Sequence, residues 1–263
     1  MTQVITDAEL INKFAQQAME APDLKIETQA PSGPEISLPG GLLQNGQLVT
    51  TAEVRELNGL DEEAISKVAT TGKALNLLLQ RGLVKLGDKE ATLEDLDNLL
   101  SGDRDAILLG IRRVTFGDTV DYNITCANCS TKQDVTIDLT TDVPVKKLKD
   151  PITDRTWKVK TKKGYANVSL PTGVTQKKLF ENVDKSSAEI NTMLLAGCVI
   201  SVNDEPSMGA STVLNLGLAD RGKIIEEVLD RNPGPRLGEV NKVCQACGEK
   251  IAFPLSLVDL FRI

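Results

Sequence analysis

Hydrophobic and polar residues alternate along several short stretches of the chain, which is the pattern of strands with one buried face. The stretches come in closely spaced pairs, at residues 35–41 and 45–50, 120–125 and 133–139, 156–161 and 166–170, and 239–243 and 250–255. Strands joined by so few residues pair in an antiparallel manner. Each pair of stretches therefore predicts a β-hairpin.

A period of three to four residues marks the helices between these hairpins. It predicts one helix from Asp61 to about Arg81, with acidic residues in the first turn and Gly82 after the end. Further helices are predicted at residues 92–100, 103–113, 187–199 and 219–230, with residues 101–105 offering a cap for the second of them. The expected fold is therefore α+β, with helical hairpins and small antiparallel sheets.

Two cysteine pairs lie at the tips of the second and fourth predicted hairpins. They are Cys126-Ala-Asn-Cys129 and Cys244-Gln-Ala-Cys247, and Gly248 follows the second pair where the chain must turn sharply. Four thiolates from two such knuckles are the tetrahedral ligand set that structural Zn²⁺ prefers. The sequence thus predicts a zinc ribbon split by the 114 residues between Cys129 and Cys244, against a usual spacing of roughly 15–20 residues.

Disulfides, free thiols and a redox dithiol are the alternatives for these cysteines. A redox pair is expected at the start of a helix in a βαβ unit, and neither pair has that setting. The fifth cysteine, Cys198, falls on the apolar side of a predicted helix, so we expect a buried, unreactive side chain.

Composition narrows the functional classes. The chain has 263 residues and no histidine, which removes the commonest general base and every mixed Cys/His zinc site. Four cysteines also close the coordination shell that catalytic zinc keeps open, so a structural zinc and no enzymatic activity are expected. No run of about 18 apolar residues and no signal peptide are evident, which predicts no membrane association and synthesis in a cytoplasm.

Positive charge is concentrated in one part of an acidic chain. Residues 145–163 contain eight lysines and arginines, and the segment 145–164 has a net charge of +6, which leaves −13 on the remainder. A solvated lysine-rich hairpin explains this pattern, whereas a nucleic-acid surface is disfavoured because few aromatic residues accompany the lysines.

Other signals point to assembly rather than catalysis. Thr6 and Glu9 have the spacing of a capping box at the start of a short amphipathic helix, which a Pro/Gly-rich linker tethers to the body. This helix either packs back on its own body or docks on another subunit, and the tether favours docking. No phosphate-binding loop is present, and the carboxylate pairs Asp95/Asp97 and Asp103/Asp105 are interpreted as helix caps and solvated faces.

The expected organisation has five parts. They are an N-terminal arm and linker (1–34), a small β unit with a helical region (35–117), a split zinc ribbon (118–140 and 236–256), an inserted α+β region (141–235) and a C-terminal tail (257–263).

Several short motifs carry a resemblance to a known family. They are Leu38-Pro39-Gly40-Gly41, Val54-Arg55-Glu56-Leu57 before Asp61-Glu62-Glu63, Asp103-Arg104-Asp105 with Ile111-Arg112-Arg113, Thr115-Phe116-Gly117 and the first cysteine pair, then Phe253-Pro254-Leu255 and Asp259-Leu260-Phe261-Arg262 after the second pair. In these motifs the chain resembles the baseplate hub and tail-assembly proteins of contractile-tailed, T-even-type bacteriophages. The resemblance covers roughly residues 35–140 and the last twenty.

The resemblance implies a virion component of the tail or baseplate, in a multi-subunit assembly with other tail proteins. The N-terminal arm and the C-terminal tail would then dock on neighbouring subunits, and no catalytic residue is implied. The alternatives are a nucleic-acid-binding zinc-ribbon protein and a transient tail-assembly chaperone.

Overall fold

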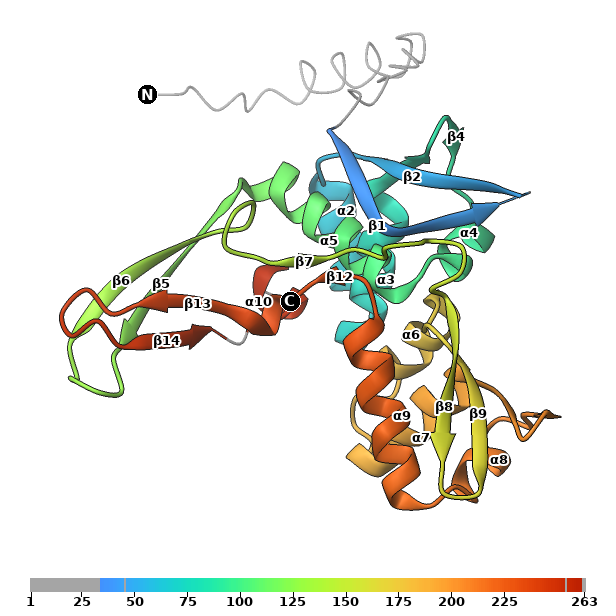
Figure 1. Cartoon of the computed structure of the whole chain (residues 1–263). Helices are drawn as coiled ribbons and strands as arrows, with labels where there is room; N and C mark the ends of the chain where they lie inside the picture. Colours follow the sequence, from blue (N-terminus) through green and yellow to red (C-terminus); the bar gives the residue numbers. More distant parts are fainter. Residues whose placement is uncertain (1–33, 45, 254, 262–263) are drawn as a thin grey trace, which may run out of the picture. The chain divides into compact units, whose positions relative to one another are not determined.

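The computed structural model describes residues 34–44, 46–253 and 255–261. Helices pack on small antiparallel sheets, which confirms the α+β class (Figure 1). The predicted capping box at Thr6 and Glu9 lies outside the described residues. No helix in the described part of the chain combines the length and apolar character that crossing a membrane requires.

The first sheet is antiparallel and contains the first predicted hairpin. Its strands are β1 (Glu35–Gln44), β2 (Gln47–Val54), β3 (Leu83–Leu86) and β4 (Lys89–Glu90), in that order. The pairing of β1 with β2 shifts between Ser37 and Leu42, where Gly41 has a φ of 70° that favours glycine. Helices α2 to α5 pack with this sheet around a core that includes Leu42, Leu79 and Ile107.

The single helix predicted from Asp61 to Arg81 is wrong. The structure has two helices there, α2 (Gly59–Ser66) and α3 (Thr71–Gly82). The Thr70 hydroxyl caps α3 by accepting a hydrogen bond from the Lys73 N–H, and Asn58 caps α2 in a capping box with Asp61. A threonine offers its hydroxyl to backbone N–H groups at a helix start, so it favours a new helix over continuation of the old one.

The next two predicted helices are present as α4 (Leu93–Asn98) and α5 (Ser101–Phe116). Thr92 and Asp95 form a capping box at the start of α4, and Asp97 pairs with Lys177 at 3.0 Å, which confirms the interpretation of Asp95 and Asp97. The predicted cap of α5 is wrong, because the N-cap residue is Leu100 and makes no side-chain bond.

A second core lies within residues 156–231. Here β8 (Thr156–Thr161), β9 (Gly164–Ser169), β10 (Val199–Val202) and β11 (Glu205–Pro206) form an antiparallel sheet. The helices of this part are α6 (Gly173–Phe180), α7 (Ser187–Cys198), α8 (Ala210–Leu214) and α9 (Leu218–Arg231). Cys198 is 1% exposed in this core, which confirms that its side chain is buried, and burial raises its pKa to about 12.

A buried arginine joins the two cores. Arg104 on α5 donates to Asn76 Oδ1 on α3, to the Leu96 carbonyl on α4 and to Gln176 Oε1 on α6, each at 2.6 Å. All three hydrogen bonds are buried, so the guanidinium replaces its hydration shell with protein acceptors. The side chain therefore fixes four helices relative to one another.

Two carboxylates beside Arg104 are not on a solvated face, which corrects the prediction for Asp103 and Asp105. Asp103 is fully buried and accepts a hydrogen bond of 2.7 Å from the Gly40 N–H, while Asp105 is half-buried and accepts one of 2.7 Å from Gln176. Burial raises the pKa of each to about 6 despite these bonds and the nearby arginines. The sequence shows only that α5 begins here and not what packs against it.

Asp103→Asn is expected to remove part of the pH dependence of stability. Because the folded state holds the Asp103 proton up to about pH 6, its contribution to the free energy of unfolding falls as the pH rises from about 4 to about 6. The free energy of unfolding of the variant, relative to that of the wild type, should therefore rise by on the order of 3 kcal/mol between pH 4 and pH 7. Urea unfolding at both pH values measures this difference, and the exposed Asp88→Asn serves as the control. Parallel pH profiles for wild type and Asp103→Asn would contradict it.

The predicted hairpins of the cysteine pairs are also present. They are β5 (Thr119–Thr125) with β6 (Lys132–Asp138), and β13 (Val240–Val243) with β14 (Lys250–Phe253). Two short strands, β7 (Val145–Lys146) and β12 (Gly234–Pro235), pair where the chain leaves and re-enters this region, and the 3₁₀ turn η1 (Leu237–Glu239) leads into β13.

The tail packs against its own chain as far as it is described. Leu257 and Leu260 of α10 (Leu257–Phe261) are buried, and Arg112 of α5 donates to the Leu260 carbonyl at 2.8 Å. Residues 257–261 are therefore part of the core rather than a free docking segment.

Candidate metal centre

The two cysteine loops have the same backbone conformation. In residues 126–131 the Cys126 N–H bonds to the Thr131 carbonyl at 3.0 Å, and the Ser130 N–H to the Cys126 carbonyl at 2.9 Å. In residues 244–249 the Cys244 N–H bonds to the Glu249 carbonyl at 2.8 Å, and the Gly248 N–H to the Cys244 carbonyl at 2.9 Å. Each loop therefore folds back on itself through its own backbone.

One position in each loop has a left-handed backbone. Gly248 has a φ of 75°, as expected of a glycine after the second pair, and Ser130 has a φ of 58° at the equivalent place in the first loop. The conformation disfavours a residue with a Cβ, and serine is less suited to it than glycine. The sequence pattern predicted the turn at Gly248 but not the one at Ser130, because serine is not a typical residue for a left-handed backbone.

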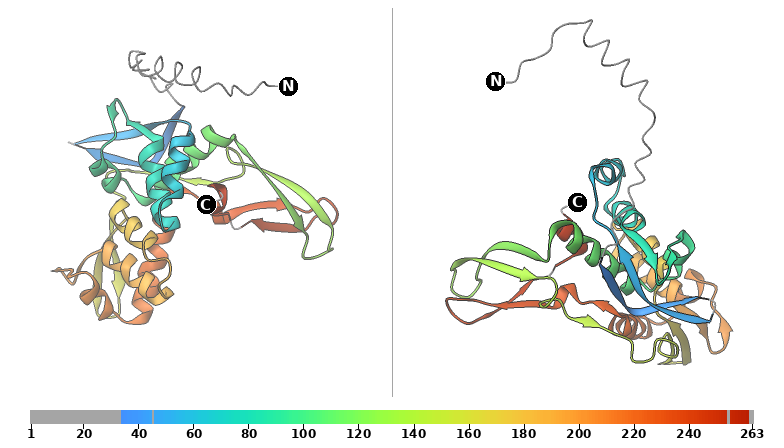
Figure 2. Two further views of the ribbon diagram at one scale, coloured as in Figure 1. Left: turned by 180° about the vertical axis from the view of Figure 1, so that it is seen from behind. Right: turned by 90° about the horizontal axis from the view of Figure 1, so that it is seen from above.

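The two hairpins lie side by side over a shared apolar core (Figure 2). Val135 and Ile137 on β6 meet Val240 on β13 and Phe253 on β14, and the rings of Tyr122 and Phe253 are 5.8 Å apart. At the tips, the Gln245 N–H donates to Gln133 Oε1 at 3.0 Å, which ties one loop to the other strand pair. These contacts hold the two loops close to each other.

The structure places the four predicted cysteines in one cluster. Their Sγ atoms all lie within 4.8 Å of one another, with Cys126 to Cys247 at 3.8 Å and Cys129 to Cys244 at 3.7 Å. Four sulfurs at about 2.3 Å from a tetrahedral Zn²⁺ are about 3.8 Å apart. The donor set and its spacing therefore fit a zinc ion.

The surroundings of the thiols favour the thiolate form at two positions. Backbone N–H groups of Cys247 and Ala246 lower the pKa of Cys244 to about 6, and the side chain and backbone of Thr131 lower the pKa of Cys129. Hydrogen bonds from the Glu249 backbone and from Asn128 lower the pKa of Cys247, but desolvation and the neighbouring Cys129 and Cys244 together outweigh them and raise it to about 11. Four thiolates so close together repel one another, and a divalent cation relieves that repulsion.

Burial is uneven around the cluster. Cys126 and Cys244 are buried, Cys129 is half-buried and Cys247 is exposed. The cluster therefore has one open side through which an ion or a chelator reaches the sulfurs. Asn128 lies on that side, with its amide nitrogen 3.6 Å from Cys247 Sγ.

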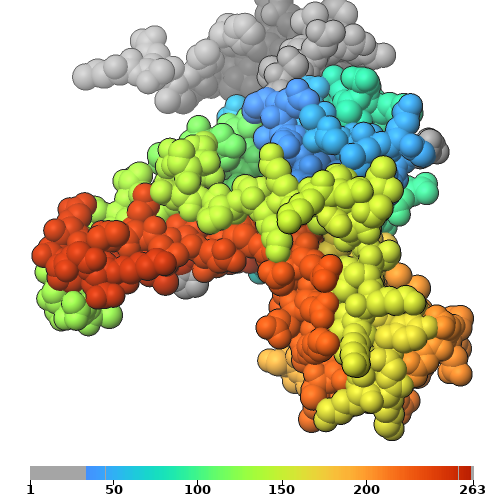
Figure 3. Space-filling view, in the orientation of Figure 1, coloured from blue at the N-terminus to red at the C-terminus, as the bar shows by residue number. Residues whose placement is uncertain are grey.

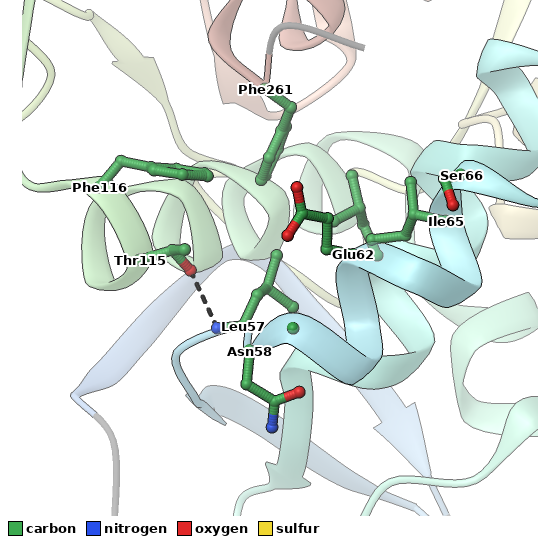
Figure 4. A pocket seen from close by; sticks show the side chains of 10 residues that line it. Leu57, Asn58, Glu62, Ile65, Ser66, Thr115, Phe116 and Phe261 are labelled. Atoms are coloured by element: carbon green, nitrogen blue, oxygen red, sulfur yellow. Dashed lines mark hydrogen bonds between the residues drawn. The ribbon is translucent and has the colours of Figure 1, made fainter. Parts of the chain in front are cut away.

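A separate apolar cavity of about 470 Å³ lies between α2, the end of α5 and α10 (Figure 4). Leu57, Ile65, Phe116 and Phe261 line it, and Glu62 is the charged residue on its wall. Sequence reasoning did not predict this cavity, because its walls come from four segments that are distant in sequence, Leu78 of α3 among them. Its lining offers shape and apolar contact rather than a set of reactive groups.

The fold and the cysteine cluster together define an α+β protein with four cysteines that could hold a metal ion. These cysteines come from two hairpins that a long inserted segment separates in the sequence. A family model described as T4 bacteriophage base plate protein matches residues 73–262, and the chain belongs to this family. The match includes the middle segment 141–235, for which the sequence motifs gave no counterpart. No curated protein and no solved structure shows significant similarity to the chain.

Membership of this family supports a structural role in the phage tail, within a multi-subunit assembly of the virion. It confirms the resemblance seen in the short motifs.

Proposed function

We propose that the protein is a non-enzymatic structural subunit of a phage baseplate or tail hub, in which one Zn²⁺ bound by Cys126, Cys129, Cys244 and Cys247 staples the two hairpins. The observation that carries this proposal is the convergence of four Sγ atoms within 4.8 Å. Four protein ligands leave zinc no open position for a water or a substrate. The ion would therefore hold the chain together rather than take part in a reaction.

The same proposal assigns docking on neighbouring subunits to the N-terminal arm, residues 1–34. Its support is the amphipathic pattern around Thr6 to Phe14 and the Pro/Gly-rich linker that follows. A short apolar helix face on a tether needs a partner surface to be covered. Because residues 257–261 are committed to the core of their own chain, a docking role of the tail is left to residues 262–263 and to the exposed side of α10.

Metal content of the purified protein tests the zinc staple. We expect one zinc per chain by elemental analysis, and none in the Cys126→Ser, Cys244→Ser double variant, which removes one ligand from each loop. Cys198→Ala is the matched control, because this thiol lies in a different core and should leave the zinc content unchanged. A metal-free wild type with four reactive thiols would refute the proposal.

Two alternatives predict different results. A nucleic-acid-binding protein would show salt-dependent affinity for DNA or RNA that Lys→Glu changes in residues 145–163 abolish. A transient assembly chaperone would be absent from purified virions by mass spectrometry, whereas a structural subunit would be present in constant ratio to other tail proteins.

A further inference from the structure

The four cysteines of the metal centre also make two close contacts between the hairpins. Cys126 Sγ lies 3.8 Å from Cys247 Sγ, and Cys129 Sγ lies 3.7 Å from Cys244 Sγ. Each contact joins one sulfur of the first loop to one of the second, and together the two contacts use all four sulfurs. The S–S bond of a disulfide is about 2.05 Å long, so each pair needs to close by less than about 2 Å to form one.

Solvent reaches the cluster at the tips of the two hairpins. The tips lie side by side at one end of the surface drawn in Figure 3, one in red and the other in green. Cys247 is exposed, and so are its neighbours from Gln245 to Lys250, whereas Cys126 and Cys244 are buried. Exposure controls how readily a thiolate is oxidised. A small oxidant therefore meets the Cys247 sulfur first.

Contacts around the cluster hold the two loops at this spacing. The Asn128 amide nitrogen of the first loop lies 3.6 Å from Cys247 Sγ, and Gln133 Oε1 accepts a hydrogen bond of 3.0 Å from the Gln245 N–H. Both contacts run from one hairpin to the other, as the two sulfur pairs do. Groups that the fold holds close together react at a high effective concentration. Oxidation along the sulfur contacts therefore joins the hairpins.

We infer that the cluster is also an oxidation site, where hydrogen peroxide converts the four thiols into the disulfides Cys126–Cys247 and Cys129–Cys244. The Cys247 thiolate attacks one peroxide oxygen, the O–O bond breaks, and the hydroxide that leaves takes up a proton to become water. The Cys126 thiolate then attacks the sulfur of the resulting sulfenic acid, so the S–S bond forms and the second oxygen leaves as water. One peroxide thus takes two electrons and two protons from each pair.

Oxidation replaces one staple by another. A disulfide sulfur carries no negative charge, so the oxidised cluster no longer binds Zn²⁺, because the thiolate is the metal ligand. The hairpins stay joined, since each disulfide runs between them and closes a loop that contains the 114 residues between Cys129 and Cys244. Cross-links over long loops restrict the unfolded chain most. The inference rests on the proposed role of the cluster as a staple, but the disulfides form from the cysteines alone.

The new bonds suit the surroundings of a virion outside its host. Disulfides persist in oxidising, extracellular surroundings, whereas thiols are kept reduced in a cytoplasm. The cluster would therefore hold the hairpins together through zinc in the cell and through disulfides after release.

Disulfide mapping of the full chain after treatment with hydrogen peroxide tests the inference. Once the remaining thiols are blocked, trypsin leaves the first cysteine pair in peptide 114–132 and the second in peptide 243–250. Without a reductant the two peptides should be joined by the disulfides named above, and dithiothreitol should separate them. Zinc, measured with a coloured chelator, should be released as the joined species forms.

Two variants show where the reaction begins. Cys247→Ala should slow the loss of thiols at least about tenfold, because the other three thiols of the cluster are buried or half-buried. Cys198→Ala is the matched control and should react as the wild type does, since this thiol lies in a different core. In the wild type, the oxidised zinc-free chain should melt roughly 10 °C above the reduced zinc-free chain.

Three outcomes would overturn the inference. They are separate peptides that each contain a disulfide within one loop, sulfinic acids in place of disulfides, and thiols that survive the peroxide. Zinc content measured before the peroxide is added tests the zinc staple independently. A zinc-free chain that forms the joined peptides refutes the zinc staple and supports the oxidation site, whereas a zinc-loaded chain that gives separate peptides does the opposite.

Discussion

Zinc removal is expected to destabilise the protein more than any of the other changes considered. Zinc binding contributes on the order of 10 kcal/mol to the folding of zinc-finger peptides, and a loss of that size corresponds to a fall in melting temperature of roughly 20 °C or more in a chain of this length. The shared core of Val135, Ile137, Val240 and Phe253 holds the two hairpins together without metal, so the effect should be smaller than complete unfolding.

Calorimetry with and without a chelator measures this effect. The exposed Cys247 gives the chelator access, and addition of Zn²⁺ in excess should restore the original melting temperature. In Cys198→Ala the chelator should cause the same fall as in the wild type, because Cys198 lies in the core of α7 and β10. An identical melting temperature before and after loss of the metal would show that the hairpins need no staple.

Gly102→Ala is expected to have the largest effect among substitutions outside the cysteine loops. A Cβ at Gly102 would lie 1.4 Å from the Pro233 carbonyl oxygen and 2.5 Å from its carbon. Both are backbone atoms, so the clash is relieved only if α5 moves away from the segment of β12, which also breaks the bond between Ser101 and Asn232. We expect a loss of more than about 3 kcal/mol, the upper end of ordinary overpacking.

Urea unfolding compares this variant with Gly222→Ala. Gly222 lies within α9 and has no atom within 4 Å of an added Cβ, so alanine should stabilise the helix by up to about 1 kcal/mol. If Gly102→Ala lowers the free energy of unfolding and Gly222→Ala raises it, the loss in Gly102→Ala comes from the contact with Pro233. Equal effects would mean that α5 adapts to the methyl group.

Local patterns in the sequence predicted the parts of the fold that local physics decides. The four hairpins follow from alternation, and the four cysteines follow from their spacing at hairpin tips. The break between α2 and α3 was not predicted, because apolar residues keep the helical period through it. The Thr70 hydroxyl caps α3 there, and this cap starts a new helix. A periodic pattern reports the buried face and not the continuity of the backbone.

Long-range contacts account for the rest. Asp103, Arg104 and Asp105 have the composition of a solvated helix start, yet Asp103 and Arg104 are buried because β1, α3, α4 and α6 supply their hydrogen-bond partners. No local rule anticipates a buried charge whose partners come from distant segments. The pairing of the two cysteine loops was predictable only because zinc chemistry demands four ligands.

The two halves of the cysteine cluster are separated by 114 residues, which has a consequence for biosynthesis. A ribosome-bound chain that has emerged only as far as Cys129 has one knuckle and two thiolates, too few to hold zinc firmly. The second knuckle emerges only after the whole of residues 141–235. Zinc acquisition would therefore wait until this entire inserted segment has been synthesised.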